Sequence, residues 1–102
     1  MDEKRKNQPE SENSGEFMPP LEFSSIIFPL YTQALIKLGL LEDPKSNQLA
    51  TNLQYAKRLI DLLDLLRDRT KGNLEPDEEN LLEAILSQLK LNYLKKIEAI
   101  KL

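Results

Sequence analysis

The stretch from Asn52 to Arg69 constrains the fold of this chain more than any other segment. Drawn as a helix of 3.6 residues per turn, it places its apolar side chains on two adjacent lines and its lysine and aspartate side chains on the opposite arc. The apolar lines consist of Leu53, Ala56, Ile60 and Leu63, and of Tyr55, Leu59, Leu62 and Leu66. Because burial of such a face supplies most of a helix's stability in water, this helix needs neighbours on two sides.

A helix over 24–40 is predicted to supply one neighbour. Ser24 or Ser25 can cap its first free amides, and Gly39 stands where a left-handed residue ends a helix. Pro29 allows two interpretations. It removes one early hydrogen bond if a serine is the cap, or it takes the favoured first position if the helix begins just before it.

The second and third helices are predicted over 52–70 and 76–100. Asn52 is the preferred cap of the second helix, with Asn47 as the alternative, and Gly72 ends it. A proline and three acidic residues suit the start of the third helix. Because the connection is short, the two helices should form an antiparallel hairpin. The predicted fold is therefore an all-α, small three-helix bundle, with the first helix across the hairpin's apolar face.

Residues 1–20 are predicted to be a disordered polar tail, because they contain too few apolar side chains to offset the entropy of ordering. The basic cluster Lys4, Arg5 and Lys6 could contact an acidic partner. It is flanked by acidic residues, however, so a solvated tail is the preferred interpretation. No apolar signal segment follows the charged N-terminus, and we therefore expect a cytoplasmic protein. The domain is expected to cover 21–102.

Composition limits the possible chemistry. The 102 residues include no cysteine and no histidine, which removes disulfides, thiolate zinc sites and the commonest general base. We therefore predict that the chain is not an enzyme and holds no cofactor and no metal. Its formal net charge of −3 also argues against nucleic acid as a partner, since phosphate binding needs a concentrated basic face.

The aspartates of the second helix recur at three- and four-residue spacing as Asp61, Asp64 and Asp68. They could in principle hold a hard cation, but no ligand loop completes a cage, and local ion pairs on a solvated face are the preferred interpretation. Asp61 is further predicted to hydrogen-bond the turn formed by Gly72 and Asn73.

Three leucines, Leu65, Leu91 and Leu94, fall outside the predicted core faces. Isolated exposed leucines are common on protein surfaces. The third helix, however, is longer than the first can cover, so we favour an interface built from these three residues. A core this small also leaves stability to be gained from oligomerisation.

The order of certain residues resembles the bacterial family catalogued as domain of unknown function 1844 (DUF1844), over about Pro20 to Tyr93. The resemblance rests on Phe23-Ser24, Ala34-Leu35, Leu38-Gly39, Asp43-Pro44, Asn52-Leu53, Ala56-Lys57, Ile60-Asp61-Leu62-Leu63, Thr70-Lys71-Gly72-Asn73-Leu74, Glu78-Glu79 and Leu81-Leu82. It implies a small, mainly helical bacterial protein without an assigned active site. Pro29 and Glu75 depart from the family's pattern, because the family's first helix is uninterrupted and its third often has a threonine cap.

Together these features predict a non-enzymatic interaction module that self-associates or binds a partner helix through its surplus apolar surface. The alternative is a peripheral membrane protein, since residues 23–36 carry no charge. Fourteen residues are too few for a bilayer span, but they could form an interfacial helix. A membrane surface is thus the less favoured partner.

Overall fold

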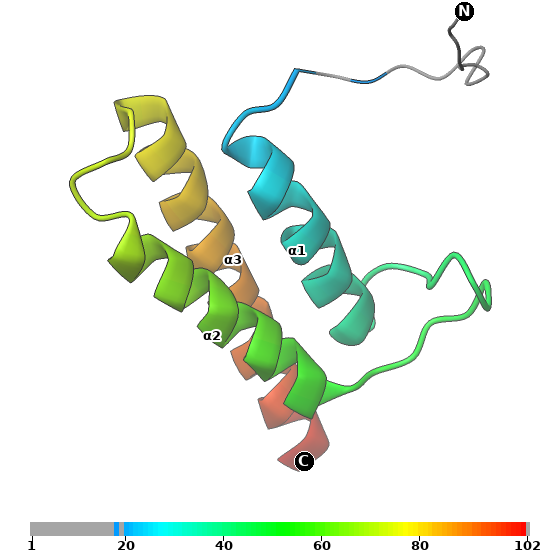
Figure 1. Ribbon diagram of the computed structural model, residues 1–102. Coiled ribbons are helices and arrows are strands. Elements are labelled where there is room, and N and C mark those ends of the chain that lie inside the picture. The colour runs from blue at the N-terminus through cyan, green and yellow to red at the C-terminus, as the bar shows by residue number, and fades with distance from the viewer. Residues whose placement is uncertain (1–17, 19, 102) are drawn as a thin grey trace, which may run out of the picture.

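Three α-helices form the computed structural model of this chain, in which residue 18 and residues 20–101 are described (Figure 1). The helices are α1 (Ser24–Lys37), α2 (Leu53–Arg69) and α3 (Pro76–Lys101). No β-strand occurs in this described part of the chain. The predicted all-α class is confirmed. The predicted disordered tail falls almost entirely outside the described residues.

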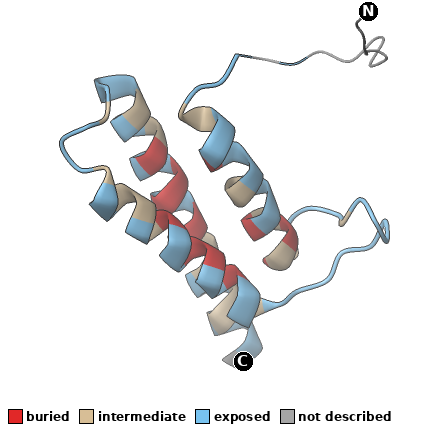
Figure 2. Ribbon diagram, viewed as in Figure 1, coloured by how far each residue is buried: buried red, intermediate tan, exposed pale blue. Residues whose placement is uncertain are grey.

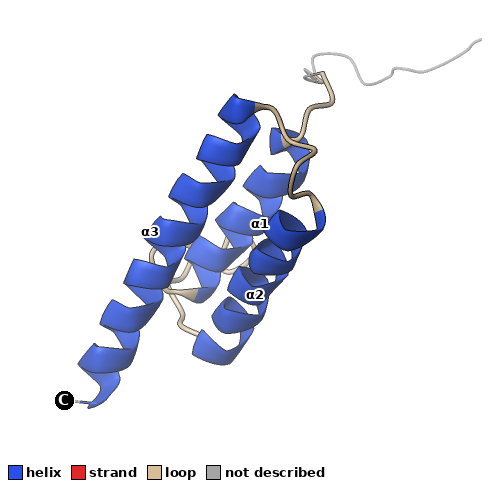
Figure 3. Ribbon diagram, turned by 90° about the vertical axis from the view of Figure 1, so that its left-hand side faces the viewer, coloured by secondary structure: helices blue, strands red, loops and turns tan. Residues whose placement is uncertain are grey.

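The helices form a triangle in which each one contacts the other two. α2 and α3 are the predicted antiparallel hairpin, and α1 runs antiparallel to α2 along the hairpin (Figure 1). Seen from the side, α3 extends past its neighbours at its C-terminal end (Figure 3). The bundle is therefore closed along most of its length, and the last turns of α3 project from it.

The core is aliphatic and lies along the inner sides of the three helices (Figure 2). No polar or charged residue is buried among the described residues. The buried cluster consists of Ile27, Ala34 and Leu38 from α1 and its end, Ala56, Leu59, Ile60 and Leu63 from α2, and Leu82, Ile85, Leu86 and Leu89 from α3. Hydrophobic burial therefore holds the bundle together without a desolvated charge to offset.

The start of α1 corrects the predicted serine cap. Phe23 is the N-cap, its backbone is already helical (φ −59°, ψ −36°), and it makes no side-chain capping hydrogen bond. Ser25 Oγ instead accepts a hydrogen bond from the backbone N–H of Glu22, 3.1 Å away. Pro29 therefore lies inside the helix, where it has no N–H to donate to the carbonyl of Ser25.

The end of α1 is a glycine turn. Gly39 has φ +77°, and the N–H of Leu40 donates to the carbonyl of Leu35 at 2.9 Å, a bond typical of a left-handed C-terminal turn. The helix itself ends at Lys37, three residues before the predicted end at residue 40, because this turn had been counted as helix.

The connection from α1 to α2 is tied at both ends. The N–H of Asn52 donates to the carbonyl of Lys37 at 2.7 Å. Within the loop, the Asp43 carboxylate accepts from the N–H of Lys45 at 2.9 Å, and the N–H of Asp43 donates to the carbonyl of Gln48 at 3.0 Å. These bonds hold the ends of α1 and α2 next to each other.

The preferred cap of α2 is confirmed. The Asn52 side chain accepts a hydrogen bond from the N–H of Tyr55 at 3.1 Å, as an N-cap does. The alternative cap, Asn47, instead has a positive φ of 55° within the preceding loop.

The turn between α2 and α3 contains Gly72 at φ +84°, and the N–H of Asn73 donates to the carbonyl of Thr70 at 2.9 Å. Glu75, the residue that departs from the family's threonine cap, donates its N–H to the Glu78 carboxylate at 2.8 Å. This is one half of a capping box, and it satisfies the backbone N–H of the residue that precedes α3.

Candidate interaction surface

An apolar groove runs between α1 and α2 on the outside of the bundle. It has a volume of about 390 Å³ and is lined by Ile26 and Leu30 from α1 and by Leu62, Leu65, Leu66 and Arg69 from α2. Five of these six residues are aliphatic. We call it the α1–α2 groove.

The groove exists because α1 covers only part of the apolar face of α2. Ala56, Leu59, Ile60 and Leu63 are buried, whereas Leu62 and Leu65 keep 44% and 49% of their surface exposed. Ile26, opposite them on α1, is also about half exposed. Several large apolar side chains that share one open groove mark an interaction site more often than scattered exposed leucines do.

The apolar surface continues along the outer side of α2 toward its N-terminus. A second open hollow, of about 880 Å³, shares Leu62 and Leu65 with the groove and adds Tyr55, Leu59 and Arg58. At this end Lys37 of α1 places its ammonium group 4.8 Å from the centre of the Tyr55 ring, a cation–π contact. The open surface therefore extends over most of the length of α2.

The charged residues along this surface are mainly cationic. Arg69 lines the groove, Arg58 lines the adjoining hollow, and Lys37 lies over Tyr55. Within the described part of the chain, none of the three forms an ion pair. Asp61 also lines the hollow, but its carboxylate is bound by Lys57.

The three predicted interface leucines do not share one surface. Leu65 lines the α1–α2 groove, whereas Leu91 and Leu94 lie on α3 outside it, 53% and 56% exposed. Leu91 follows the fully buried Leu82 by nine residues and thus lies about 180° around α3 from it. Any contact made by Leu91 and Leu94 is therefore separate from the groove.

Among the six residues that line the groove, only Leu65 was predicted to form an interface; Ile26 and Leu62 are the other two large apolar side chains there that remain about half exposed. Leu62 lies on one of the two apolar lines of α2, and those lines were predicted to be covered. The signal was present in the width of that face, which spans nearly half of the helix circumference and exceeds what one small neighbour covers.

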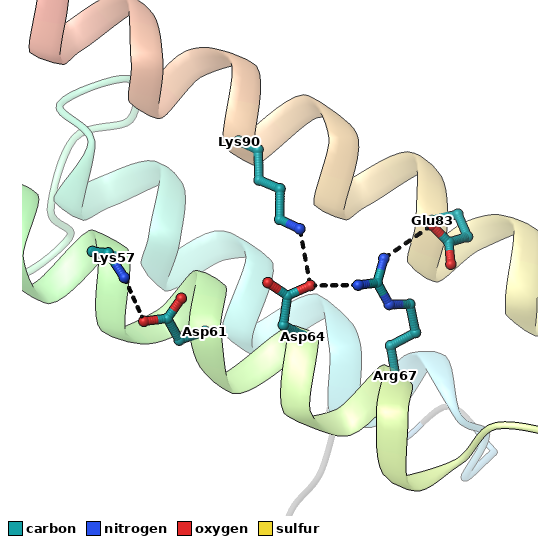
Figure 4. Close-up of polar contacts among 6 residues, drawn as sticks. All are labelled: Lys57, Asp61, Asp64, Arg67, Glu83 and Lys90. Atoms are coloured by element: carbon teal, nitrogen blue, oxygen red, sulfur yellow. Dashed lines mark hydrogen bonds and ion pairs between the residues drawn. The ribbon is translucent and has the colours of Figure 1, made fainter.

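The predicted ion pairs on α2 are present (Figure 4). Lys57 Nζ lies 2.8 Å from Asp61 Oδ2, one turn along the helix. Asp64 Oδ1 accepts from Arg67 at 2.9 Å and from Lys90 of α3 at 3.0 Å. The Asp64 group therefore links α2 to α3.

Arg67 makes a further ion pair between α2 and α3, because its other terminal nitrogen donates to Glu83 of α3 at 3.2 Å. Within the described residues, no group of three or more acidic side chains is placed to hold a metal ion.

Asp61 has a different partner from the one predicted. Its carboxylate binds Lys57 instead of the turn at Gly72 and Asn73. The physical reason is its position: it precedes the end of α2 at Arg69 by eight residues, or about 12 Å at 1.5 Å per residue. The N–H of Asn73 is instead bound within the turn.

The pair with Asp61 alters the chemistry of Lys57. The hydrogen bond to the Asp61 carboxylate, and then the negative charge of that carboxylate, raise the pKa of Lys57 above its ordinary value. Both side chains are more than half exposed, so the pair is screened by solvent and contributes little to folding.

None of the helices in the described part of the chain is both long and apolar enough to cross a membrane. Comparison with known proteins finds no matching curated protein and no matching solved structure. A family model does match, over residues 20–95, which includes all of α1 and α2 and most of α3. In agreement with the resemblance seen in the sequence, the chain belongs to the family described as Domain of unknown function (DUF1844).

Proposed function

We propose that this chain is a non-enzymatic, cytoplasmic interaction module that binds a partner helix in the α1–α2 groove. The observation that carries the proposal is the row of half-exposed aliphatic side chains, Ile26, Leu62 and Leu65, along one open groove. Leaving these side chains in water costs free energy that a partner could recover by covering them.

A helix is the partner element that fits this geometry best. α1 and α2 are antiparallel neighbours (Figure 1). A helix of the partner, laid between them on the outside, would continue the packing of the bundle. Its apolar residues at positions i, i+3, i+4 and i+7 would contact Leu62 and Leu65 of α2 and Ile26 of α1.

The chemistry of the side chains supports a binding role over catalysis. The chain has no histidine or cysteine, and the carboxylates of Asp61 and Asp64 are bound by lysine and arginine side chains. Carboxylates that are held in ion pairs by neighbouring cationic side chains serve as structural groups, because they are not placed to accept a proton from a substrate.

The test is an NMR titration of the ¹⁵N-labelled full chain with a helical peptide of about 15 residues, bearing leucines at i, i+3, i+4 and i+7 among glutamines. We expect binding by the natural chain and by Leu91→Glu, and loss of binding in Leu65→Glu. Leu91→Glu is the matched control, since it places the same charge at an equally exposed leucine outside the groove. Equal binding by both variants would refute the proposal.

Self-association through α3 is the other part of the proposal. Leu91 and Leu94 are three residues apart, so they are neighbours on the surface of α3, and both are more than half exposed. We expect sedimentation at micromolar concentration to show a dimer or larger species that Leu91→Glu with Leu94→Glu converts to a monomer. A natural chain that is monomeric under these conditions would refute self-association through α3.

A second candidate function is peripheral membrane binding at the start of α1. Met18, Leu21, Ile26 and Phe28 are large apolar residues there, and Leu21 is 94% exposed. Such side chains can insert into the headgroup region of a bilayer. Co-sedimentation with anionic liposomes should then be lost in Leu21→Glu with Phe28→Glu. Absence of binding by the natural chain at low salt would dismiss this function.

A further inference from the structure

The charges beside the α1–α2 groove are unequally distributed. Of the three acidic side chains of α2, Asp61 and Asp64 form ion pairs with Lys57 and Arg67, and Asp68 lines neither the groove nor the adjoining hollow. The remaining α2 charges that line the open surface are Arg58 and Arg69.

α1 adds to this imbalance. It contributes a single charged residue, Lys37, and no acidic one. The groove has an aliphatic floor with Arg69 at its edge, and Arg58 and Lys37 lie along the adjoining hollow. Groove and hollow together therefore have a cationic rim formed by these three side chains.

A second copy of the chain fits this groove poorly. In a two-fold dimer the same patch meets itself, so the cationic rim of one copy would face the cationic rim of the other. Like charges brought together across an interface disfavour association. The carboxylate of Asp61 is already paired with Lys57, and one carboxylate in each copy does not balance three cationic side chains.

Docking of α3 from another copy is also unfavourable. The three helices form a triangle, and Leu91 points away from its centre, on the side opposite the α1–α2 groove. If the outer face of α3 entered the groove of the next copy, the contact would be heterologous and would build a ring or an open chain of molecules. Two-fold dimers with the same patch on both copies are by far the commonest soluble oligomers, which favours another occupant.

We infer that the occupant of the α1–α2 groove is an acidic amphipathic helix of a different protein. The inference rests on the proposed function and adds the chemical class of the partner. Leucine-like anchors of that helix contact Ile26, Leu62 and Leu65, and its flanking aspartate or glutamate side chains face Arg58 and Arg69. Arginine suits this role because its planar guanidinium binds carboxylates with two parallel hydrogen bonds.

The test uses the full chain and two labelled peptides of about 15 residues with the same leucine spacing, one flanked by glutamates and the other by lysines. Fluorescence anisotropy at low salt should show the glutamate peptide binding at least about tenfold more tightly. We expect the difference to shrink as salt is raised, since the Debye length falls to about 3 Å at 1 M.

The charge-reversal variant Arg58→Glu with Arg69→Glu should invert this preference. Its matched control is Lys45→Glu with Lys95→Glu, which changes the net charge equally at exposed positions outside the groove and should keep the preference for glutamate. Equal effects of the two double variants would show a response to net charge alone and would overturn the inference.

The remaining outcomes separate this inference from the proposed function. Equal binding of the two peptides, or tighter binding of the lysine peptide, overturns the acidic partner while leaving the groove as a helix-binding site, provided that Leu65→Glu abolishes binding. Binding of neither peptide by a chain whose dimer Leu65→Glu converts to a monomer assigns the groove to a second copy and overturns the inference. Binding of neither peptide by a monomer, or by a dimer that Leu65→Glu leaves intact, overturns both.

Discussion

Gly39 and Gly72 have nearly the same backbone conformation but different surroundings. Their φ angles are +77° and +84°, and residues other than glycine rarely adopt such positive values. A Cβ atom on Gly39 would lie 2.5 Å from Thr51 Oγ1, whereas one on Gly72 would meet nothing within 4 Å. Gly39 is therefore required for two reasons and Gly72 for one.

Gly39→Ala should accordingly destabilise the protein more than Gly72→Ala. The conformational cost, about 1–2 kcal/mol, is common to both variants, and only Gly39→Ala adds a clash with Thr51. The free energy of unfolding from urea denaturation measures each effect. Adding Thr51→Ala should recover part of the loss in Gly39→Ala and none in Gly72→Ala. Equal losses in the two glycine variants would show that the clash has no energetic effect.

The pair of Lys57 and Asp61 is a second prediction at the residue scale. Asp61→Asn should lower the pKa of Lys57, because it removes the carboxylate that raises it. NMR titration of the Lys57 side chain measures this, with Asp68→Asn as a control that should leave that pKa unchanged. An unaltered Lys57 pKa in Asp61→Asn would contradict the ion pair.

The raised pKa of Lys57 determines how the stabilisation by the Lys57–Asp61 pair depends on pH. The pair stabilises the folded state at pH values below the ordinary pKa of lysine, and this contribution is lost as the pH rises through the raised pKa. Because the pair is exposed, we expect Asp61→Asn to change the Tm only slightly at neutral pH.

At the scale of the helices, the sequence predicts what local chemistry determines. The Asn52 cap, the Gly72 turn and the proline at the start of α3 act through nearby backbone groups, and the bounds of α2 and α3 were predicted to within one residue. The start of α1 was predicted less well. Phe23 packs against the core and caps the helix without a polar side chain, so tertiary contact replaces the local signal.

Pro29 in α1 gives a prediction at this scale. It is exposed, so Pro29→Ala removes no core packing and restores the missing N–H. We expect the free energy of unfolding to rise by about 1–2 kcal/mol, the gain in helix hydrogen bonding less the entropy that proline removes from the unfolded chain. Gln33→Ala, at another exposed α1 position, should change it by less than about 0.5 kcal/mol. A loss of stability in Pro29→Ala would contradict this account of α1.

At the scale of the whole molecule, the triangular packing could be predicted but the groove could not. Amphipathic patterns show which face of each helix is apolar. They do not show how much of that face a neighbour covers, because coverage depends on the angle and register at which α1 meets α2. For the same reason the sequence did not show that Leu65 lies on a different surface from Leu91 and Leu94. Which faces of two helices adjoin is determined only when the helices pack together.

Neighbouring leucines of α2 test this division into core and surface. Leu63 is fully buried, so Leu63→Ala should cost about 2–5 kcal/mol of unfolding free energy. Leu65 is half exposed, and Leu65→Ala should cost less than about 1 kcal/mol. Urea denaturation of the two variants measures both values. A large loss in Leu65→Ala would place that residue in the core and remove it from the groove.

The most direct test of the central claim, that the α1–α2 groove receives a partner helix, is the detection of intermolecular NOEs between a leucine-bearing helical peptide and the full chain with ¹³C-labelled methyl groups. The account predicts NOEs from the peptide to the methyl groups of Ile26, Leu62 and Leu65. NOEs confined to Leu91 and Leu94 of α3, with none to those three residues, would contradict it.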